Sequence, residues 1–218
     1  MELDHPPRWQ RIVPSIPALI PTFRQQRRHM ADNNLQGLRV AILATDLFEE
    51  AELIEPRKAL DAAGARTEVV SPKAGEIQAV QHDKKTQKVK VDRTLDSVSV
   101  DDYDAILLPG GAMNADALRI ERKAQELVRH ANEANMPIAV ICHGPWLLVS
   151  AGLLQGRKMT SYKTIQDDIR NAGATWTDEQ VVRDKNWVSS RQPSDIPAFN
   201  REMLALFAEA RTRKDKAA

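Results

Sequence analysis

The chain has 218 residues, of which 42% are hydrophobic and 28% charged, a composition typical of a globular protein with one good-sized core. Its formal net charge is +1, from 31 basic and 30 acidic side chains, which argues against nucleic acid as the main partner because phosphate binding needs a basic excess. A single cysteine cannot form an internal disulfide, and no apolar run approaches the roughly 18 residues of a membrane span. We therefore expect a cytoplasmic protein in a reducing compartment, without a membrane partner.

The first part of the chain differs from the rest. Residues 1–37 contain five of the twelve prolines. Pro14 and Pro17 interrupt the apolar run Ile12–Ile20, so this run cannot form the helix of a signal peptide. We divide the chain into a poorly ordered, proline-rich arm (1–37), one domain (38–210) and a charged tail (211–218).

From residue 38 onward, strands and helices are expected to alternate. Buried strands are predicted at Leu38–Thr45, at Ala105–Leu108 and at Ile138–Ile141, the last a short unbroken apolar run. A further strand is expected at Ala65–Ser71, where Pro72 ends it. Amphipathic patterns predict helices at Phe48–Ala63, Ile120–Asn135, Pro145–Ala151, Ile165–Asn171 and Phe199–Ala210. Polar or short extended patterns predict a surface hairpin at Glu76–Val91, an extended piece at Lys158–Thr160, and short antiparallel strands at Trp176, Val181–Val182 and Trp187–Ser190. The alternation favours an α/β fold with a mainly parallel sheet and helices on both faces.

The only cysteine lies where a predicted strand turns abruptly into a predicted helix. Cys142 follows the strand Ile138–Ile141, Gly144 leaves room for a tight turn, and Pro145 suits the first turn of a helix. This arrangement is that of a nucleophile elbow, and the free N–H groups at the helix start favour the reactive thiolate. His143 is a possible base. The alternative is that Cys142 is a small buried hydrophobe.

Two other strand ends carry unusual residues that should meet the cysteine at one edge of the sheet. Gly110 and Gly111 follow one strand, and their backbone N–H groups could approach a ligand closely, although a simple turn is the plainer explanation. Glu49 and Glu52 follow another. A glutamate buried near the thiolate should be protonated and donate a hydrogen bond, whereas an exposed one would only complement the helix dipole.

Several motifs resemble the PfpI family of intracellular-protease-like proteins over about residues 38–210. In chain order they are Phe48-Glu49-Glu50-Ala51-Glu52-Leu53, Leu108-Pro109-Gly110-Gly111, Ala139-Val140-Ile141-Cys142-His143-Gly144-Pro145-Trp146, Gly156-Arg157-Lys158-Met159-Thr160-Ser161-Tyr162, Asn171-Ala172-Gly173-Ala174 and Trp187-Val188-Ser189-Ser190-Arg191. The resemblance implies a flavodoxin-like, three-layer α/β/α sandwich similar to class I glutamine amidotransferase domains.

The resemblance also implies roles for individual residues. Cys142 would be the nucleophile and His143 its neighbour in catalysis. A protonated glutamate would contact the thiolate, with Glu52 as first choice and Glu49 as second. The implied oxyanion and substrate-binding residues are Gly110, Gly111, Gly144, Tyr162 and Asp116, with the N–H groups of Gly111 and His143 as oxyanion donors. Asp116 would complete a Cys-His-acid triad in the adjacent subunit of a homodimer or higher oligomer; it could equally cap the turn before Ala117.

The implied function is that of a cysteine-dependent stress-response enzyme acting on small aldehydes or on glycated protein or peptide, as a deglycase or glyoxalase. An intracellular cysteine peptidase is one alternative. A non-catalytic redox or stress sensor that works through oxidation of Cys142 is another. We expect no cofactor and no metal, because the histidines are scattered without ligand spacing, at positions 5, 29, 82, 130 and 143.

Overall fold

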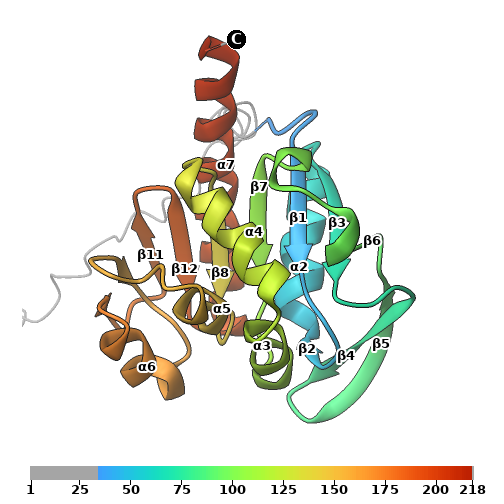
Figure 1. Ribbon diagram of the computed structural model, residues 1–218, viewed down its shortest axis with the longest axis vertical. Coiled ribbons are helices and arrows are strands. Elements are labelled where there is room, and N and C mark those ends of the chain that lie inside the picture. Colours follow the sequence, from blue (N-terminus) through green and yellow to red (C-terminus); the bar gives the residue numbers. More distant parts are fainter. Residues whose placement is uncertain (1–33, 218) are drawn as a thin grey trace, which may run out of the picture.

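The computed structural model describes residues 34–217 (Figure 1). The predicted arm therefore lies almost entirely outside the described residues. Its last part belongs to the packed domain, because Leu35 is fully buried in the core and its backbone N–H donates to the carbonyl oxygen of Ala63. The packed chain thus includes residues before the expected boundary at Leu38.

A seven-stranded sheet forms the centre of the molecule, in the order β11-β12-β8-β7-β1-β3-β6. All neighbours are parallel except β11 and β12, which pair antiparallel. The strands are β1 (Arg39–Leu43), β3 (Arg66–Ser71), β6 (Arg93–Thr94), β7 (Ala105–Leu108), β8 (Ile138–Ile141), β11 (Val181–Asp184) and β12 (Trp187–Ser190). The predicted α/β sandwich with a mainly parallel sheet is confirmed.

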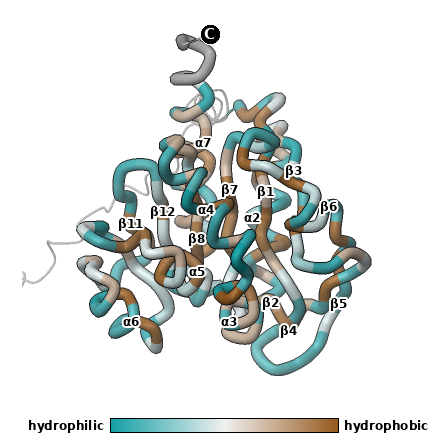
Figure 2. The backbone as a smooth tube through the Cα atoms, viewed as in Figure 1, coloured by the Kyte–Doolittle hydropathy of each residue, from teal (hydrophilic) through white to brown (hydrophobic). Residues whose placement is uncertain are grey.

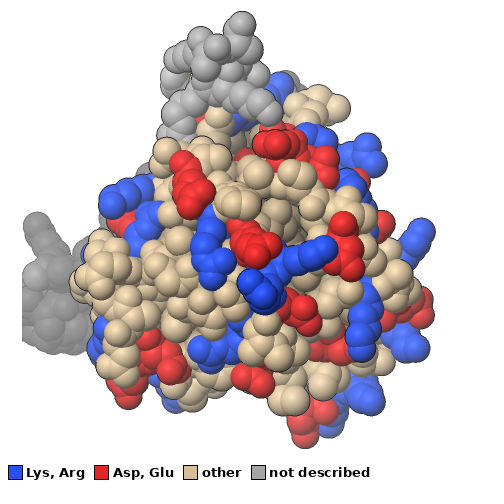
Figure 3. All heavy atoms as spheres, in the orientation of Figure 1, with Lys and Arg blue, Asp and Glu red and all other residues tan. Residues whose placement is uncertain are grey.

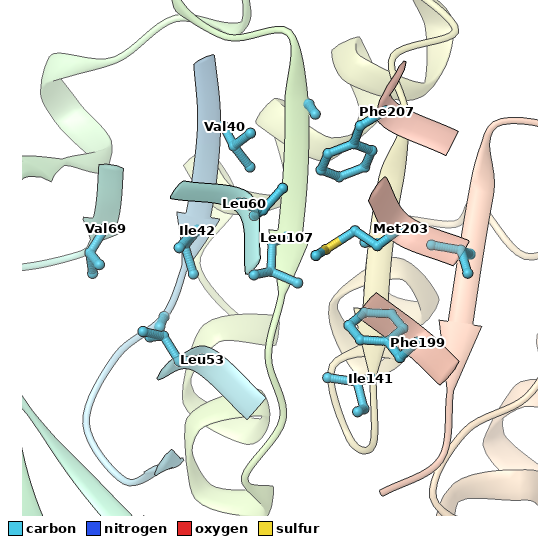
Figure 4. Close-up of a cluster of buried hydrophobic side chains, with 14 of the residues drawn as sticks. Val40, Ile42, Leu53, Leu60, Val69, Leu107, Ile141, Phe199, Met203 and Phe207 are labelled. Carbon is cyan, nitrogen blue, oxygen red and sulfur yellow. The ribbon is translucent and has the colours of Figure 1, made fainter. Parts of the chain in front are cut away.

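Helices cover both faces of this sheet. Helices α2 (Glu50–Ala62) and α7 (Ile196–Ala217) pack on one face. Leu60 and Met203 lie beside Leu107 of β7, and Phe199 lies beside Ile141 of β8 (Figure 4). The other face is covered by α4 (Arg122–Glu133), α5 (Pro145–Ser150) and α6 (Gln166–Asn171). Hydrophobic segments accordingly gather along the central strands, and hydrophilic segments lie on the outer loops and helices (Figure 2).

Two smaller sheets flank the central one. The predicted hairpin is confirmed as the antiparallel pair β4 (Glu76–Gln81) and β5 (Lys84–Lys90). It is extended by β2 (Phe48–Glu49), two residues that were expected to begin a helix but pair with β4 instead. Strand β10 (Thr175–Trp176) pairs with β9 (Lys158–Met159) in parallel, so the expected antiparallel pairing of Trp176 is wrong.

The helices differ from expectation at three places. Helix α3 (Ala112–Arg119) was not predicted, and the predicted helix from Ile120 begins at Arg122. Helix α7 continues through Ala217, so the backbone of 211–217 is helical. Short 3-10 turns are η1 (Leu95–Ser97), η2 (Val100–Asp102), η3 (Lys163–Ile165) and η4 (Pro193–Asp195).

The surface carries both signs of charge. Acidic and basic side chains are intermixed over the face drawn in Figure 3, in keeping with the formal net charge of +1. Within the described residues, no helix is both long enough and apolar enough to cross a bilayer.

Candidate active site

Cys142 occupies the strained turn that joins β8 to α5. Its φ angle is 62°, in the left-handed region that costs an ordinary residue about 1–2 kcal/mol. Two backbone hydrogen bonds hold this conformation: the N–H of Cys142 donates to the carbonyl oxygen of Ser190 at 3.1 Å, and the N–H of Tyr162 donates to the carbonyl oxygen of Cys142 at 2.9 Å. The geometry expected of a nucleophile elbow is therefore present, and Cys142 keeps 7% of its surface exposed.

Gly144 allows the chain to turn tightly behind the sulfur. A Cβ atom at this position would lie 2.7 Å from the carbonyl oxygen of Leu108 and 2.9 Å from Cγ2 of Val140. Only glycine fits such an approach between the turn and two adjacent strands. Gly144 thus shapes the elbow and is absent from the lining of the pocket described below.

The Pro109-Gly110-Gly111 turn packs directly against the cysteine and a glutamate. A Cβ atom on Gly110 would lie 2.4 Å from Oε2 of Glu52 and 2.7 Å from Cβ of Cys142. Gly111 has a φ angle of 86°, and a Cβ atom there would meet the carbonyl oxygen of Leu47 at 2.6 Å. Gly110 is therefore needed for the close approach to Cys142 and Glu52, and Gly111 for its left-handed backbone. Of the two, Gly111 lines the pocket described below.

Glu52, on the first turn of α2, is fully buried beside Cys142. Its Oε2 accepts the backbone N–H of Gly110 at 2.9 Å, and the carboxyl hydrogen-bonds the Cys142 side chain. Oε1 has no hydrogen-bond partner among the described residues. Burial raises the pKa of Glu52 to about 8, although the bonds from Cys142 and Gly110 oppose the shift and the charge of Glu49 adds to it. Glu52 is therefore a protonated acid at neutral pH.

The ionisation of Cys142 depends on the state of Glu52. With Glu52 ionised, the pKa of the thiol lies well above its ordinary value: burial is the largest cause, and Glu52 adds to it by its charge and by accepting the S–H hydrogen bond. Backbone hydrogen bonds from Gly111 and His143 lower it. Below about pH 8, Glu52 is protonated, so neither its charge nor its acceptance of the S–H hydrogen bond raises the pKa of the thiol. The carboxyl can instead donate a hydrogen bond to the sulfur.

One ring nitrogen of His143 faces the sulfur of Cys142, and the other faces the hydroxyl group of Thr164. Its Nδ1 lies 3.2 Å from Sγ of Cys142, and its Nε2 lies 3.3 Å from Oγ1 of Thr164. The rings of Tyr162 and Trp146 lie 5.0 and 5.3 Å from the imidazole, centroid to centroid. Burial lowers the pKa of His143, which favours the neutral imidazole that can act as a base.

Glu49 lies in the same pocket but has a different partner. Its Oε2 accepts the backbone N–H of His82 at 3.1 Å, which ties β2 to the turn of the β4–β5 hairpin. Of the two candidate glutamates, only Glu52 hydrogen-bonds Cys142. The geometry thus separates the first and second choices in the predicted order.

The pocket in front of the sulfur has a volume of about 640 Å³. Its walls come from the elbow, the Gly111 turn, the hairpin and the loop at η4. The lining residues are Leu47, Glu49, Glu52, Val80, His82, Asp83, Lys85, Gly111, Ala112, Met113, Cys142, His143, Tyr162, Gln192, Pro193 and Ser194. The hairpin and η4 residues were not predicted, because nothing in their sequence indicates that they fold over a strand end more than 50 residues away.

Asp116 lies outside this pocket. It is exposed in the middle of α3, a helix that begins at Ala112, so it cannot cap a turn before Ala117 as the alternative required. Within the described residues, no three His, Cys, Asp or Glu side chains form a group that could hold a metal ion.

Comparison with known proteins identifies the family of the chain. Residues 38–206 match the model of the DJ-1/PfpI family. The chain is 43% identical over 169 residues to the deglycase PfpI of Pyrococcus furiosus, covering 78% of this chain and 99% of that protein. It is 39% identical over 168 residues to the putative cysteine protease YraA of Bacillus subtilis, covering 77% and 97%.

Solved structures show the same likeness. The crystal structure of a two-domain protein from Anabaena variabilis, with DJ-1/ThiJ/PfpI-like and ferritin-like domains, superposes with a TM-score of 0.72 at 31% identity, over 77% of this chain and 47% of that one. The protein therefore belongs to the DJ-1/PfpI family.

Proposed function

We propose that this chain is a cysteine-dependent deglycase that removes small dicarbonyl adducts from glycated protein or peptide, with Cys142 as nucleophile. The observation that carries the proposal is the surroundings of the Cys142 sulfur at the elbow. A buried acid, Glu52, and two backbone N–H groups, of Gly111 and His143, all hydrogen-bond it. Such donors are what a nucleophilic thiolate requires. The deglycase name of the Pyrococcus relative supports the same reaction class.

The reaction begins with the thiolate. In an early glycation adduct, the former aldehyde carbon carries a hydroxyl group and the amine. Sγ of Cys142 forms a bond to this carbon while the carbon–nitrogen bond breaks, and the leaving amine takes a proton from the buried acid Glu52. The product on the enzyme is a hemithioacetal, and the protein's amine is free.

The hemithioacetal then rearranges and is hydrolysed. The neutral His143 removes the proton from the carbon bonded to sulfur while the neighbouring ketone oxygen gains a proton, which gives an enediol. His143 then returns its proton to the former ketone carbon, and the hydroxyl on the carbon bonded to sulfur loses its proton, which leaves a thioester beside a new hydroxyl group. Water attacks the thioester, the carbon–sulfur bond breaks, and a 2-hydroxy acid leaves. The N–H groups of Gly111 and His143 stabilise negative charge on sulfur or oxygen during these steps. Free methylglyoxal would enter at the hemithioacetal, which is the glyoxalase variant of the proposal.

The pocket favours a modified side chain over a folded polypeptide backbone. Cys142 is 7% exposed and lines a space of about 640 Å³, within the size range of small-molecule sites. A single extended adduct can reach the sulfur, whereas a peptidase must place several residues of main chain along an open groove. The relative named as a putative cysteine protease keeps peptide cleavage among the outcomes to be tested.

A second copy of the chain could complete the site. Asp116 is exposed on α3, beside the helix turn that carries the pocket residue Met113. Met113 and Ile120 are the large hydrophobic side chains left exposed on the described surface, at 62% and 75%. A homo-oligomer that covers them could direct Asp116 toward the partner's His143.

One experiment separates the candidate functions. The reduced protein is incubated with a methylglyoxal-modified peptide, with free methylglyoxal and with casein, beside the Cys142→Ser variant. We expect release of the unmodified peptide and of a hydroxy acid, and no release by the variant. Cleavage of casein would establish a peptidase instead. Stable oxidation of Cys142 by mild peroxide, with no turnover of any substrate, would establish a redox sensor.

A further inference from the structure

Asn114 is a fully buried polar residue that the proposed mechanism does not use. It lies in the first turn of α3, immediately after the Pro109-Gly110-Gly111 turn. Its side-chain amide makes three hydrogen bonds. Nδ2 donates to the carbonyl oxygen of Gly110 at 2.9 Å and to that of Pro109 at 3.3 Å, and Oδ1 accepts the backbone N–H of Thr45 at 2.7 Å.

These bonds fix the orientation of two successive peptide planes. In a trans peptide the C=O and the following N–H point in opposite directions. The carbonyl of Pro109 points to Asn114, and the N–H of the same peptide, on Gly110, donates to Oε2 of Glu52. The carbonyl of Gly110 also points to Asn114, and the N–H of that peptide, on Gly111, donates to the sulfur of Cys142.

We propose that Asn114 is a positioning residue: its one amide group holds two carbonyls on one side of the turn and thereby aims the two N–H groups at Glu52 and Cys142. The inference rests on the proposed function only in taking Cys142 as the reactive thiol. The N–H of Gly111 then stabilises the thiolate, and the N–H of Gly110 holds the protonated Glu52 beside it.

Asparagine suits this position because both ends of its amide are needed. The donor end of the amide holds the turn, and the acceptor end binds the backbone N–H of Thr45, the second residue after β1. The turn is thereby anchored to the central sheet. Glycine residues would otherwise leave the turn free to rotate. A second attachment, from the N–H of Glu49 to the carbonyl oxygen of Gly110, is longer, at 3.4 Å.

The test measures the thiol itself and needs no substrate. Because Cys142 is the only cysteine, the rate of alkylation by iodoacetamide, followed by intact mass from pH 5 to 10, reports this sulfur alone. All the other titratable side chains that line the pocket remain in the variants, namely Glu49, Glu52, His82, Asp83, Lys85, His143 and Tyr162. In Asn114→Leu we expect alkylation at pH 7 to be about tenfold slower. The pH at which the rate is half its maximum should rise by about one unit, as for loss of one hydrogen bond to a charged group.

Controls separate positioning from stability. Asn186→Leu also removes a buried asparagine, whose amide donates to the carbonyl oxygen of Met136, where β12 begins rather than at the elbow; it should lower thermal stability and leave the alkylation profile unchanged. If Asn114→Leu does not fold, Asn114→Asp is used. It keeps the shape and the acceptor for Thr45 but loses the amide donor, and it should slow alkylation in the same direction.

An alkylation profile equal to that of the native chain, in either folded Asn114 variant, would overturn the inference. The result is independent of the substrate assay. If no glycated substrate is turned over but Asn114→Leu shifts the thiol, the proposed function fails and the positioning role stands. If substrate is turned over and the thiol does not shift, the reverse holds.

Discussion

The backbone N–H of Gly110 donates to Oε2 of Glu52 at 2.9 Å, across 58 residues of sequence. Oε1 has no hydrogen-bond partner among the described residues, so it is the oxygen available to carry the proton of the buried acid. A glutamine at position 52 can copy the arrangement, because its carbonyl accepts from Gly110 and its amide donates to the sulfur, but it cannot give up a proton.

Glu52→Gln should therefore separate reactivity of the thiol from turnover. We expect alkylation of Cys142 below pH 8 to stay within a few-fold of native, while turnover falls about 10²-fold or more as an acid catalyst is lost. In the native chain, ionisation of Glu52 near pH 8 raises the pKa of the thiol and should bend the alkylation profile. The bend should be missing in the variant. Equal turnover by native and variant would remove Glu52 from proton transfer.

Gly110→Ala should damage the site through contact rather than charge. The added methyl group would lie 2.4 Å from Oε2 of Glu52 and 2.7 Å from Cβ of Cys142, and such overpacking costs about 1–3 kcal/mol of unfolding free energy. Turnover and alkylation should both fall. Gly156→Ala is the matched control: nothing lies within 4 Å of its Cβ, so only its φ of 71° opposes the change. It should cost about 1 kcal/mol and leave alkylation unchanged.

Thr164→Val should alter the protonation of His143. The hydroxyl of Thr164 lies 3.3 Å from Nε2, and its removal leaves that nitrogen to solvent while Nδ1 still faces the sulfur. We expect a modest fall in kcat, about 3- to 10-fold, with KM little changed and rescue by Thr164→Ser. Rates equal in the Val and Ser variants would show that the hydroxyl is irrelevant.

Activity should also have an acidic limit that reports His143. Burial lowers the pKa of this imidazole, so the neutral base persists to lower pH than in a free histidine, and activity should fall only well below pH 6.5. In the His143→Asn variant, activity should be lower at every pH, and the fall in activity on the acidic side should be absent. A rate that halves at or above pH 6.5 would contradict the neutral, buried imidazole.

Asp116→Asn tests whether a second subunit contributes. If the carboxylate acts on the partner's His143, activity should coelute with an oligomer in gel filtration, and the variant should keep the oligomer but lose about 10²-fold in turnover. A fully active monomer peak would exclude the role. So would unchanged turnover in the variant.

Much of the site follows from the sequence because parallel strands present their carboxyl ends at one edge. The elbow at Cys142 could be predicted from an apolar run followed by Gly144 and Pro145. The glycine pair could be placed beside it because the strand that ends at Leu108 is buried along its length. Both predictions depend on short-range pattern.

The parts that could not be predicted depend on long-range contacts. Strand β2 is two residues long, and its partner lies about 30 residues later, so a helix was the better local choice for Phe48. Helix α3 has no side-chain cap at Gly111 and only eight residues, which leaves little periodicity to detect. The roles of Asn114 and Thr164 arise only when separate loops meet, since each acts through a backbone or ring atom of another segment.

The central claim is that the sulfur of Cys142 is ionised near neutral pH although it is buried. The most direct measurement is the alkylation rate of the single cysteine in the reduced native chain, followed by intact mass as pH is varied. We expect the rate to reach half its maximum below about pH 8.5, the pKa of a free cysteine. A half-maximum at or above that pH would show that burial prevails over the N–H groups of Gly111 and His143, and that the sulfur is not ionised near neutral pH.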